Sequence, residues 1–216
     1  MADGFRRHDL VRVEASAFAH LLRGRPDLDG APDVADWAVR GRPLIVRRYG
    51  PGEDRSLVPV GLPLPPAAGK RRIGLALLFP TLAPLPAPTL AQARGSAPEA
   101  WQPTIEALLA LGTANGLVPR PFGALLWQAL TGLAYLAPTS DLDLLWPVTE
   151  VPPGFLAGLA QIAAAAPMRI DGEVILPDGA GIHWQELHEA GGAVLAKHRD
   201  RLEMRDAAGL RAQVAA

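Results

Sequence analysis

The sequence predicts an α+β fold in two domains separated by a proline-rich linker. Three observations support this: short strand patterns fill the first eighty residues, prolines interrupt the stretch that follows, and longer apolar helix patterns alternate with strands thereafter. We expect a small N-terminal α+β domain over residues 1–80, a linker over 81–96 and a larger domain over 97–216. The larger domain should contain a mixed sheet flanked by helices.

The N-terminal elements follow from side-chain periodicity. Strands are expected at residues 8–13, 43–48, 56–62 and 71–78, where β-branched residues such as Val11, Val13 and Val46 recur. Helical spacing of Phe18, Leu21 and Leu22 predicts a helix over residues 15–23. After these elements, the prolines of residues 79–96 rule out a helix and favour an extended, semi-rigid spacer.

The larger domain is expected to begin at a helix. Ser96-Ala97-Pro98-Glu99 matches a capping box, and the helix would run to about residue 110, with Pro103 as a kink or as the true start. Later helices are expected from Gly123, over 154–166, over 184–190 and from Arg199 onward. Alternation predicts strands at 168–176, 180–184 and 193–197, the first two joined by a turn at Pro177-Asp178-Gly179.

Composition excludes several classes of protein. A formal net charge of −1 gives no basic field for bulk nucleic-acid binding. Without cysteine, disulfides, thiolate metal sites and cysteine nucleophiles are excluded. The first nine residues lack the apolar core of a signal peptide, and no apolar run reaches the ~18 residues of a membrane span. We therefore expect a cytoplasmic protein without nucleic-acid or membrane partners.

The strongest chemical signal lies between Gly123 and Trp146, where a glycine turn, an apolar helix and an acidic strand follow one another. Asp141 and Asp143 are two residues apart, so both carboxylates leave the same face of a strand. Paired carboxylates suit a divalent cation on a phosphate substrate, and backbone N–H groups at the helix start suit the phosphate. The alternative is a strand start with solvated acids.

A later strand carries two more acids. Asp171 and Glu173 share one face of the expected strand over 168–176. If this strand lies beside Asp141 and Asp143, three carboxylates converge, and such a set can hold two Mg²⁺ ions for an in-line displacement. The alternative is a turn or a bulge at Asp171-Gly172 and a solvated Glu173. The chain has no P-loop, no Gly-x-Ser-x-Gly and no Gly-x-Gly-x-x-Gly motif.

These features together resemble the nucleotidyltransferase superfamily. Several blocks are similar to the phosphoribosyl-dephospho-CoA transferases of the malonate decarboxylase system, also called holo-acyl-carrier-protein synthases. They are Arg7-His8-Asp9-Leu10-Val11, residues 62–66 with 69–73, Trp127-Gln128-Ala129-Leu130-Thr131-Gly132-Leu133, Ser140-Asp141-Leu142-Asp143-Leu144-Leu145 and Asp171-Gly172-Glu173-Val174-Ile175-Leu176-Pro177-Asp178-Gly179.

The resemblance implies a reaction and a site. The family transfers the phosphoribosyl-dephospho-CoA group from 2′-(5″-triphosphoribosyl)-3′-dephospho-CoA to a serine of the apo acyl carrier subunit, and pyrophosphate leaves. On this chain it implies Mg²⁺ or Mn²⁺ at Asp141 and Asp143, a further carboxylate from Asp171 or Glu173, and a close backbone approach to phosphate at Gly123. Charge suggests that Lys197, Lys70 and Arg71 face the pyrophosphate end; the alternative for such residues is a solvated strand end.

One residue departs from the superfamily pattern, and two other functions stay open. Ala124 stands where the superfamily usually has serine, so we expect weaker phosphate binding rather than an inactive enzyme. The first alternative function is another nucleotidyltransferase-fold enzyme, one that uses ATP. The second is a non-catalytic, carrier-binding assembly factor that has kept the fold.

Overall fold

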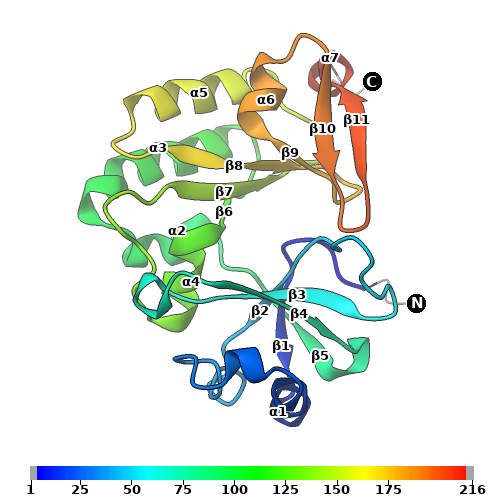
Figure 1. Ribbon diagram of the computed structural model, residues 1–216. Helices are drawn as coiled ribbons and strands as arrows, with labels where there is room; N and C mark the ends of the chain where they lie inside the picture. The colour runs from blue at the N-terminus through cyan, green and yellow to red at the C-terminus, as the bar shows by residue number, and fades with distance from the viewer. Residues whose placement is uncertain (1–3, 213–216) are drawn as a thin grey trace. The chain divides into compact units, whose positions relative to one another are not determined.

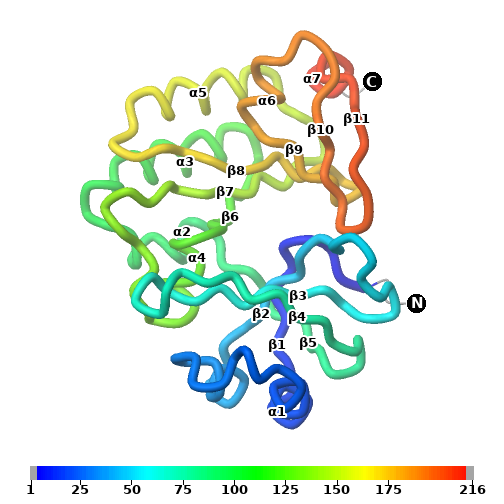
Figure 2. The backbone as a smooth tube through the Cα atoms, viewed as in Figure 1, coloured from blue at the N-terminus to red at the C-terminus, as the bar shows by residue number. Residues whose placement is uncertain are grey.

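The computed structural model describes residues 4–212, and the chain divides between Ala87 and Pro88 into two compact units (Figures 1 and 2). We call these the N-terminal and the C-terminal unit. The division lies inside the proline-rich segment. Both units combine helices with a sheet, so the fold is α+β as the sequence predicts.

The N-terminal unit is built on a five-stranded sheet in the order β4-β3-β2-β1-β5, with antiparallel neighbours throughout. Its strands are β1 (Leu10–Val13), β2 (Leu44–Val46), β3 (Val58–Pro63), β4 (Arg72–Leu77) and β5 (Leu82–Leu85). Helix α1 (Ala15–Arg23) and three 3-10 turns, η1 (Pro26–Leu28), η2 (Pro66–Ala68) and η3 (Phe79–Thr81), join them. The first four strands and the helix confirm the sequence predictions. Alternate strand residues and Phe18 and Trp37 fill the core.

The expected linker over residues 81–96 is wrong. Residues 82–85 form β5, which pairs with β1 from Val13↔Leu82 to Leu10↔Leu85. Pro84 is tolerated because β5 is an edge strand, where a missing N–H need not break a ladder. Beyond the division, Thr89 and Gln92 form a capping box on helix α2 (Leu90–Ala93), which leads into η4 (Arg94–Ser96).

The C-terminal unit is built on a six-stranded mixed sheet in the order β11-β10-β9-β8-β7-β6 (Figure 1). Its strands are β6 (Arg120–Pro121), β7 (Leu142–Pro147), β8 (Ile170–Ile175), β9 (Gly181–His183), β10 (Ala193–Lys197) and β11 (Leu202–Asp206). Only β7 and β8 are parallel. Parallel neighbours need a crossover connection, and helix α5 (Phe155–Ala165) supplies it.

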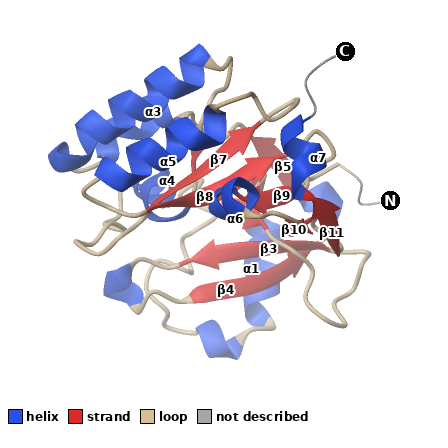
Figure 3. Cartoon of the chain, turned by 90° about the horizontal axis from the view of Figure 1, so that it is seen from above, coloured by secondary structure: helices blue, strands red, loops and turns tan. Residues whose placement is uncertain are grey.

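Helices pack against this sheet and against one another. They are α3 (Gln102–Ala114), preceded by η5 (Glu99–Trp101), α4 (Gly123–Thr131), α5, α6 (Trp184–Glu189) and α7 (Ala207–Ala212). Helix α3 contacts α5, and α5 contacts α6 (Figure 3). The core beneath them includes Trp146, Phe155 and Trp184, each at most 2% exposed. No helix within residues 4–212 has the length and apolar character needed to cross a bilayer.

Two predictions for this unit are wrong. The helix does not start at a capping box on Ser96, but the alternative that Pro103 marks the true start is confirmed: α3 begins at Gln102, with Pro103 in the first turn, where a missing N–H breaks no hydrogen bond. The tail after Arg199 is not simply a helix, because residues 202–206 form β11 and only residues 207–212 are helical. β11 pairs along its whole length with β10, from Lys197↔Leu202 to Ala193↔Asp206. The hydrogen bonds of this pairing stabilise a strand in a segment whose own apolar pattern is weak.

Candidate active site

The parallel pairing of β7 and β8 brings three aspartates together. The register sets Asp143 opposite Asp171, and Asp141 immediately precedes β7. Carboxylate oxygens of Asp141, Asp143 and Asp171 all lie within 4.8 Å of one another. We call these three residues the aspartate cluster. Hard oxygen donors in such a group suit Mg²⁺ or Mn²⁺ better than softer metals.

Asp171, rather than Glu173, belongs to this cluster. Glu173 lies two residue pairs further along β8, opposite Leu145, and its Oε1 atom is 3.6 Å from Nζ of Lys197. The alternative of a turn or a bulge at Asp171-Gly172 with a solvated Glu173 is wrong, because β8 runs through both residues in unbroken register with β7 and Glu173 is buried. Gly172 has φ +135°, and a Cβ atom there would lie 1.8 Å from the carbonyl oxygen of Leu144. A glycine is therefore required for β8 to lie this close to β7.

Fixed donors hold one oxygen of Asp171. The backbone N–H of Gly172 donates to Oδ1 over 2.6 Å, and Nε2 of His183 lies 2.9 Å from the same atom. His183 is also the N-cap of α6, where its Nδ1 accepts from the N–H of Glu186. Because Nδ1 is an acceptor, the ring proton is on Nε2, which donates to Asp171. The histidine thereby orients the carboxylate.

Arg169 contacts the other oxygen of Asp171. Its Nη2 atom is 2.5 Å from Oδ2 of Asp171, and its Nη1 atom is 3.7 Å from Oδ2 of Asp141. The sequence analysis missed both Arg169 and His183. Arg169 could have been identified from the sequence, because it lies two residues before Asp171 and therefore on the same face of the expected strand. His183 could not, because its position opposite Glu173 depends on the β8–β9 hairpin register.

Gly123 makes room for Asp143. It begins α4 with φ +59°, and a Cβ atom there would lie 2.0 Å from Oδ2 of Asp143. The backbone N–H of Phe122 also donates to the Asp143 carbonyl over 2.9 Å. No side chain caps α4. The first turn of α4 therefore starts beside Asp143 of the aspartate cluster, where the helix dipole favours negative charge.

The loop between α4 and the cluster is fastened by Gln128. Its Oε1 accepts from the N–H groups of Tyr135 and Leu136, each at 3.1 Å, and its Nε2 donates to the carbonyl of Ser96 over 2.7 Å. Trp127 is 4% exposed, and its ring lies 6.4 Å from the ring of Tyr135, between centroids, at an interplanar angle of 35°. Gln128 thus joins α4 to the loop that follows it, and Trp127 belongs to the core.

The predicted basic residues lie in both units. Lys197 ends β10 in the C-terminal unit, with its side chain 27% exposed and directed to Glu173. Lys70 and Arg71 are exposed in the turn that precedes β4 of the N-terminal unit. A role for all three at the pyrophosphate end stays a prediction.

Comparison with known proteins identifies the family. The family model described as the phosphoribosyl-dephospho-CoA transferase MdcG C-terminal domain matches residues 89–208, and the corresponding N-terminal domain model matches residues 6–79. The chain belongs to the phosphoribosyl-dephospho-CoA transferase family. The aspartate cluster lies wholly within the segment that matches the C-terminal domain.

Two relatives carry the name of this transferase. A protein of Bradyrhizobium diazoefficiens is 39% identical over 204 residues, which cover 93% of this chain and 89% of the relative. A protein of Xanthomonas campestris pathovar campestris is 38% identical over 199 residues, which cover 90% of this chain and 91% of the relative. No solved structure matches the chain.

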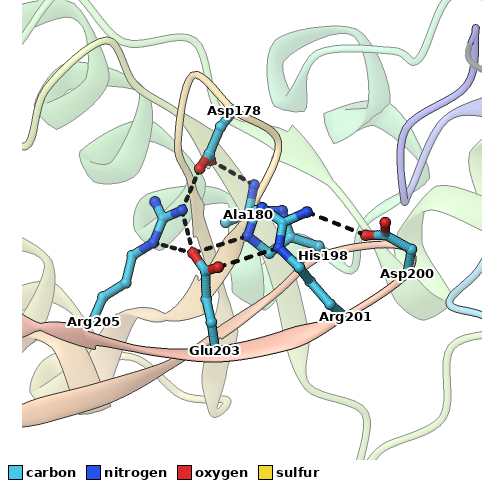
Figure 4. A network of polar contacts seen from close by, with 7 residues as sticks. All are labelled: Asp178, Ala180, His198, Asp200, Arg201, Glu203 and Arg205. Atoms are coloured by element: carbon cyan, nitrogen blue, oxygen red, sulfur yellow. Dashed lines mark hydrogen bonds and ion pairs between the residues drawn. The ribbon is translucent and has the colours of Figure 1, made fainter.

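A second group of acids in this transferase is balanced by the protein's own cations. Asp178 and Glu203 both contact Arg205, Glu203 also contacts Arg201, and Nε2 of the buried His198 is 3.2 Å from Glu203 (Figure 4). The contact with the imidazole of His198, then the hydrogen bonds from Arg205 and Arg201, lower the pKa of Glu203 to about 2. Burial opposes ionisation of Asp178, but Arg205 and the N–H of Ala180 outweigh it and lower its pKa. This ionic network joins the β10–β11 hairpin to the turn after β8.

Proposed function

We propose that this chain transfers the phosphoribosyl-dephospho-CoA group from 2′-(5″-triphosphoribosyl)-3′-dephospho-CoA to a serine of the apo acyl carrier subunit of malonate decarboxylase. The observation that carries this proposal is the convergence of Asp141, Asp143 and Asp171 beside the first turn of α4. Such a site suits a phosphate ester under nucleophilic attack. The names of the relatives support the transferred group, and the resemblance to the malonate decarboxylase system supports the acceptor.

The aspartate cluster fits a divalent cation. Three carboxylates offer oxygen atoms within 4.8 Å of one another, and Mg²⁺ and Mn²⁺ prefer oxygen ligands. Asp141, Asp143 and Asp171 would hold the ion. A bound Mg²⁺ supplies charge neutralisation at the triphosphate and so stabilises the transition state of phosphoryl transfer.

The chain's own groups position the donor and accept a proton. Backbone N–H groups at the start of α4 bind phosphate oxygens, which compensates in part for the missing hydroxyl at Ala124. The serine oxygen forms a bond to the α-phosphorus, the bond from that phosphorus to the pyrophosphate oxygen breaks, and the serine proton passes to a carboxylate. Asp171, in the aspartate cluster, and Glu173, beside Lys197, are the two candidates for this acceptor.

The test is to incubate the protein with Mg²⁺, the triphosphoribosyl-dephospho-CoA donor and the apo carrier subunit, and to weigh the carrier by intact-mass spectrometry. We expect a mass gain of one phosphoribosyl-dephospho-CoA unit that disappears with EDTA and does not occur with ATP as donor. A carrier that stays unmodified with intact donor and Mg²⁺ would refute the proposal. A nucleotide added from ATP would instead favour a different nucleotidyltransferase-fold activity.

The variant Asp141→Asn distinguishes an enzyme from an assembly factor. Loss of one metal ligand should reduce transfer by several orders of magnitude while leaving carrier binding intact. A variant that keeps both the transfer and the carrier binding would exclude the proposed metal chemistry.

A further inference from the structure

We propose that Arg169 is an exchangeable cation of this site: it neutralises the aspartate cluster before a metal ion binds, and afterwards binds the polyphosphate of the donor. The inference rests on the proposed function, since it takes the aspartate cluster as the metal site. Arg169 thereby has a part in binding the substrate.

The contacts of Asp171 show why Arg169 and a metal ion compete. Oδ1 of Asp171 already accepts from the backbone of Gly172 and from His183, at 2.6 and 2.9 Å. Oδ2 is therefore the oxygen that this carboxylate offers to a cation, and Nη2 of Arg169 lies 2.5 Å from it. The same guanidinium reaches Oδ2 of Asp141 at 3.7 Å. A divalent ion bound to these two oxygens must displace the guanidinium.

The side chain of Arg169 is free to change its position while its backbone stays fixed. Its side chain is 58% exposed, and its carbonyl accepts from the N–H of Leu142 over 2.9 Å, which anchors the residue at the start of β8. An exposed ion pair contributes little to stability, so displacement by a divalent ion is inexpensive. Arg205 of the second network differs: its side chain is 25% exposed and contacts both Asp178 and Glu203, so it is held in place.

A displaced Arg169 remains attached beside the metal site. Its planar guanidinium offers five N–H donors in a fork that matches phosphate oxygens, which a lysine cannot reproduce. The ligand expected for it is an anionic polyphosphate bound with the metal ion, such as the triphosphate of the donor or the pyrophosphate product. Arg169 should therefore oppose metal binding and favour polyphosphate binding.

The experiment measures these two equilibria separately and does not depend on turnover. Mn²⁺ is titrated into the full-length protein and free Mn²⁺ is followed by electron paramagnetic resonance; pyrophosphate is then titrated at saturating Mn²⁺. We expect Arg169→Gln to bind Mn²⁺ roughly three- to tenfold more tightly and pyrophosphate about tenfold more weakly. Arg169→Lys should keep most of the competition with Mn²⁺ but little of the pyrophosphate binding.

Arg40→Gln is the matched control. Arg40 is similarly exposed, at 56%, and pairs with Asp36 over 3.3 Å, but it lies in the N-terminal unit. The Arg40→Gln variant should bind Mn²⁺ and pyrophosphate with the affinities of the unmodified protein. A purely structural role for Arg169 would weaken both affinities, and that result, or unchanged affinities in Arg169→Gln, would overturn the inference.

A further variant separates this inference from the proposed function. Asp143→Asn should weaken Mn²⁺ binding strongly. If Asp143→Asn and the unmodified protein bind Mn²⁺ alike, the aspartate cluster is not the metal site, and both proposals fail together. If Asp143→Asn loses the ion while Arg169→Gln does not differ from the unmodified protein, only the role of Arg169 fails.

Discussion

Replacing Gly123 with alanine should damage catalysis far more than stability. The new Cβ would lie 2.0 Å from Oδ2 of Asp143, so the carboxylate must retreat by about 1.4 Å to reach the 3.4 Å of ordinary contact. A misplacement of about 1 Å in a catalytic group lowers activity by roughly a hundredfold. We therefore expect at least a hundredfold loss of carrier modification, together with weaker Mn²⁺ binding.

The loss of stability should be modest by comparison. A left-handed backbone with a Cβ atom costs about 1–2 kcal/mol, and alanine recovers about 0.4–1 kcal/mol by restricting the unfolded chain. A strained Asp143 rotamer adds about 0.5–1.5 kcal/mol. The net cost is about 0.5–3 kcal/mol, which thermal unfolding followed by circular dichroism should show as a decrease in Tm of several degrees.

Gly132→Ala is the control for backbone strain alone. Gly132 ends the same helix with φ +70°, and no atom lies within 4 Å of a Cβ placed there. The Gly132→Ala variant should have a smaller decrease in Tm, because it lacks the strain on Asp143, and near-normal transfer activity. Equal activity in the two variants would refute the reasoning, because the position of Asp143 would then not depend on the glycine.

Three further outcomes are expected. Asp143→Asn should abolish carrier modification by mass spectrometry while the carrier still binds in a pull-down, because one metal ligand is lost and no core residue is changed. Gln128→Ala should lower the free energy of unfolding in urea by about 1–3 kcal/mol, because it leaves the N–H groups of Tyr135 and Leu136 without their acceptor. Glu203→Gln should reduce Tm at neutral pH but not near pH 2. The pKa of Glu203 in the folded protein, about 2, is below its ordinary 4.5, so the stabilisation is complete above pH 4.5 and lost as pH falls toward 2. A Tm difference that persists at pH 2 would contradict this account of the ionic network.

The sequence by itself determined most local structure and the family. Side-chain periodicity located the helix over 15–23 and the strand over 193–197 with the bounds that the structure has. The spacing of Asp141 and Asp143 identified the strand start on which the candidate site is built. These features depend on residues a few positions apart, so the order of residues along the chain is sufficient to predict them.

Tertiary structure decided which distant residues meet. Asp171 and Glu173 share a strand face, and only the parallel register with β7 brings Asp171 to the aspartate cluster and leaves Glu173 with Lys197. Residues 82–85 look like a spacer because the partner of β5 is β1, some seventy residues earlier in the sequence. Strand pairing and register are set by long-range hydrogen bonds and crossover geometry, so they emerge only when the sheet is assembled.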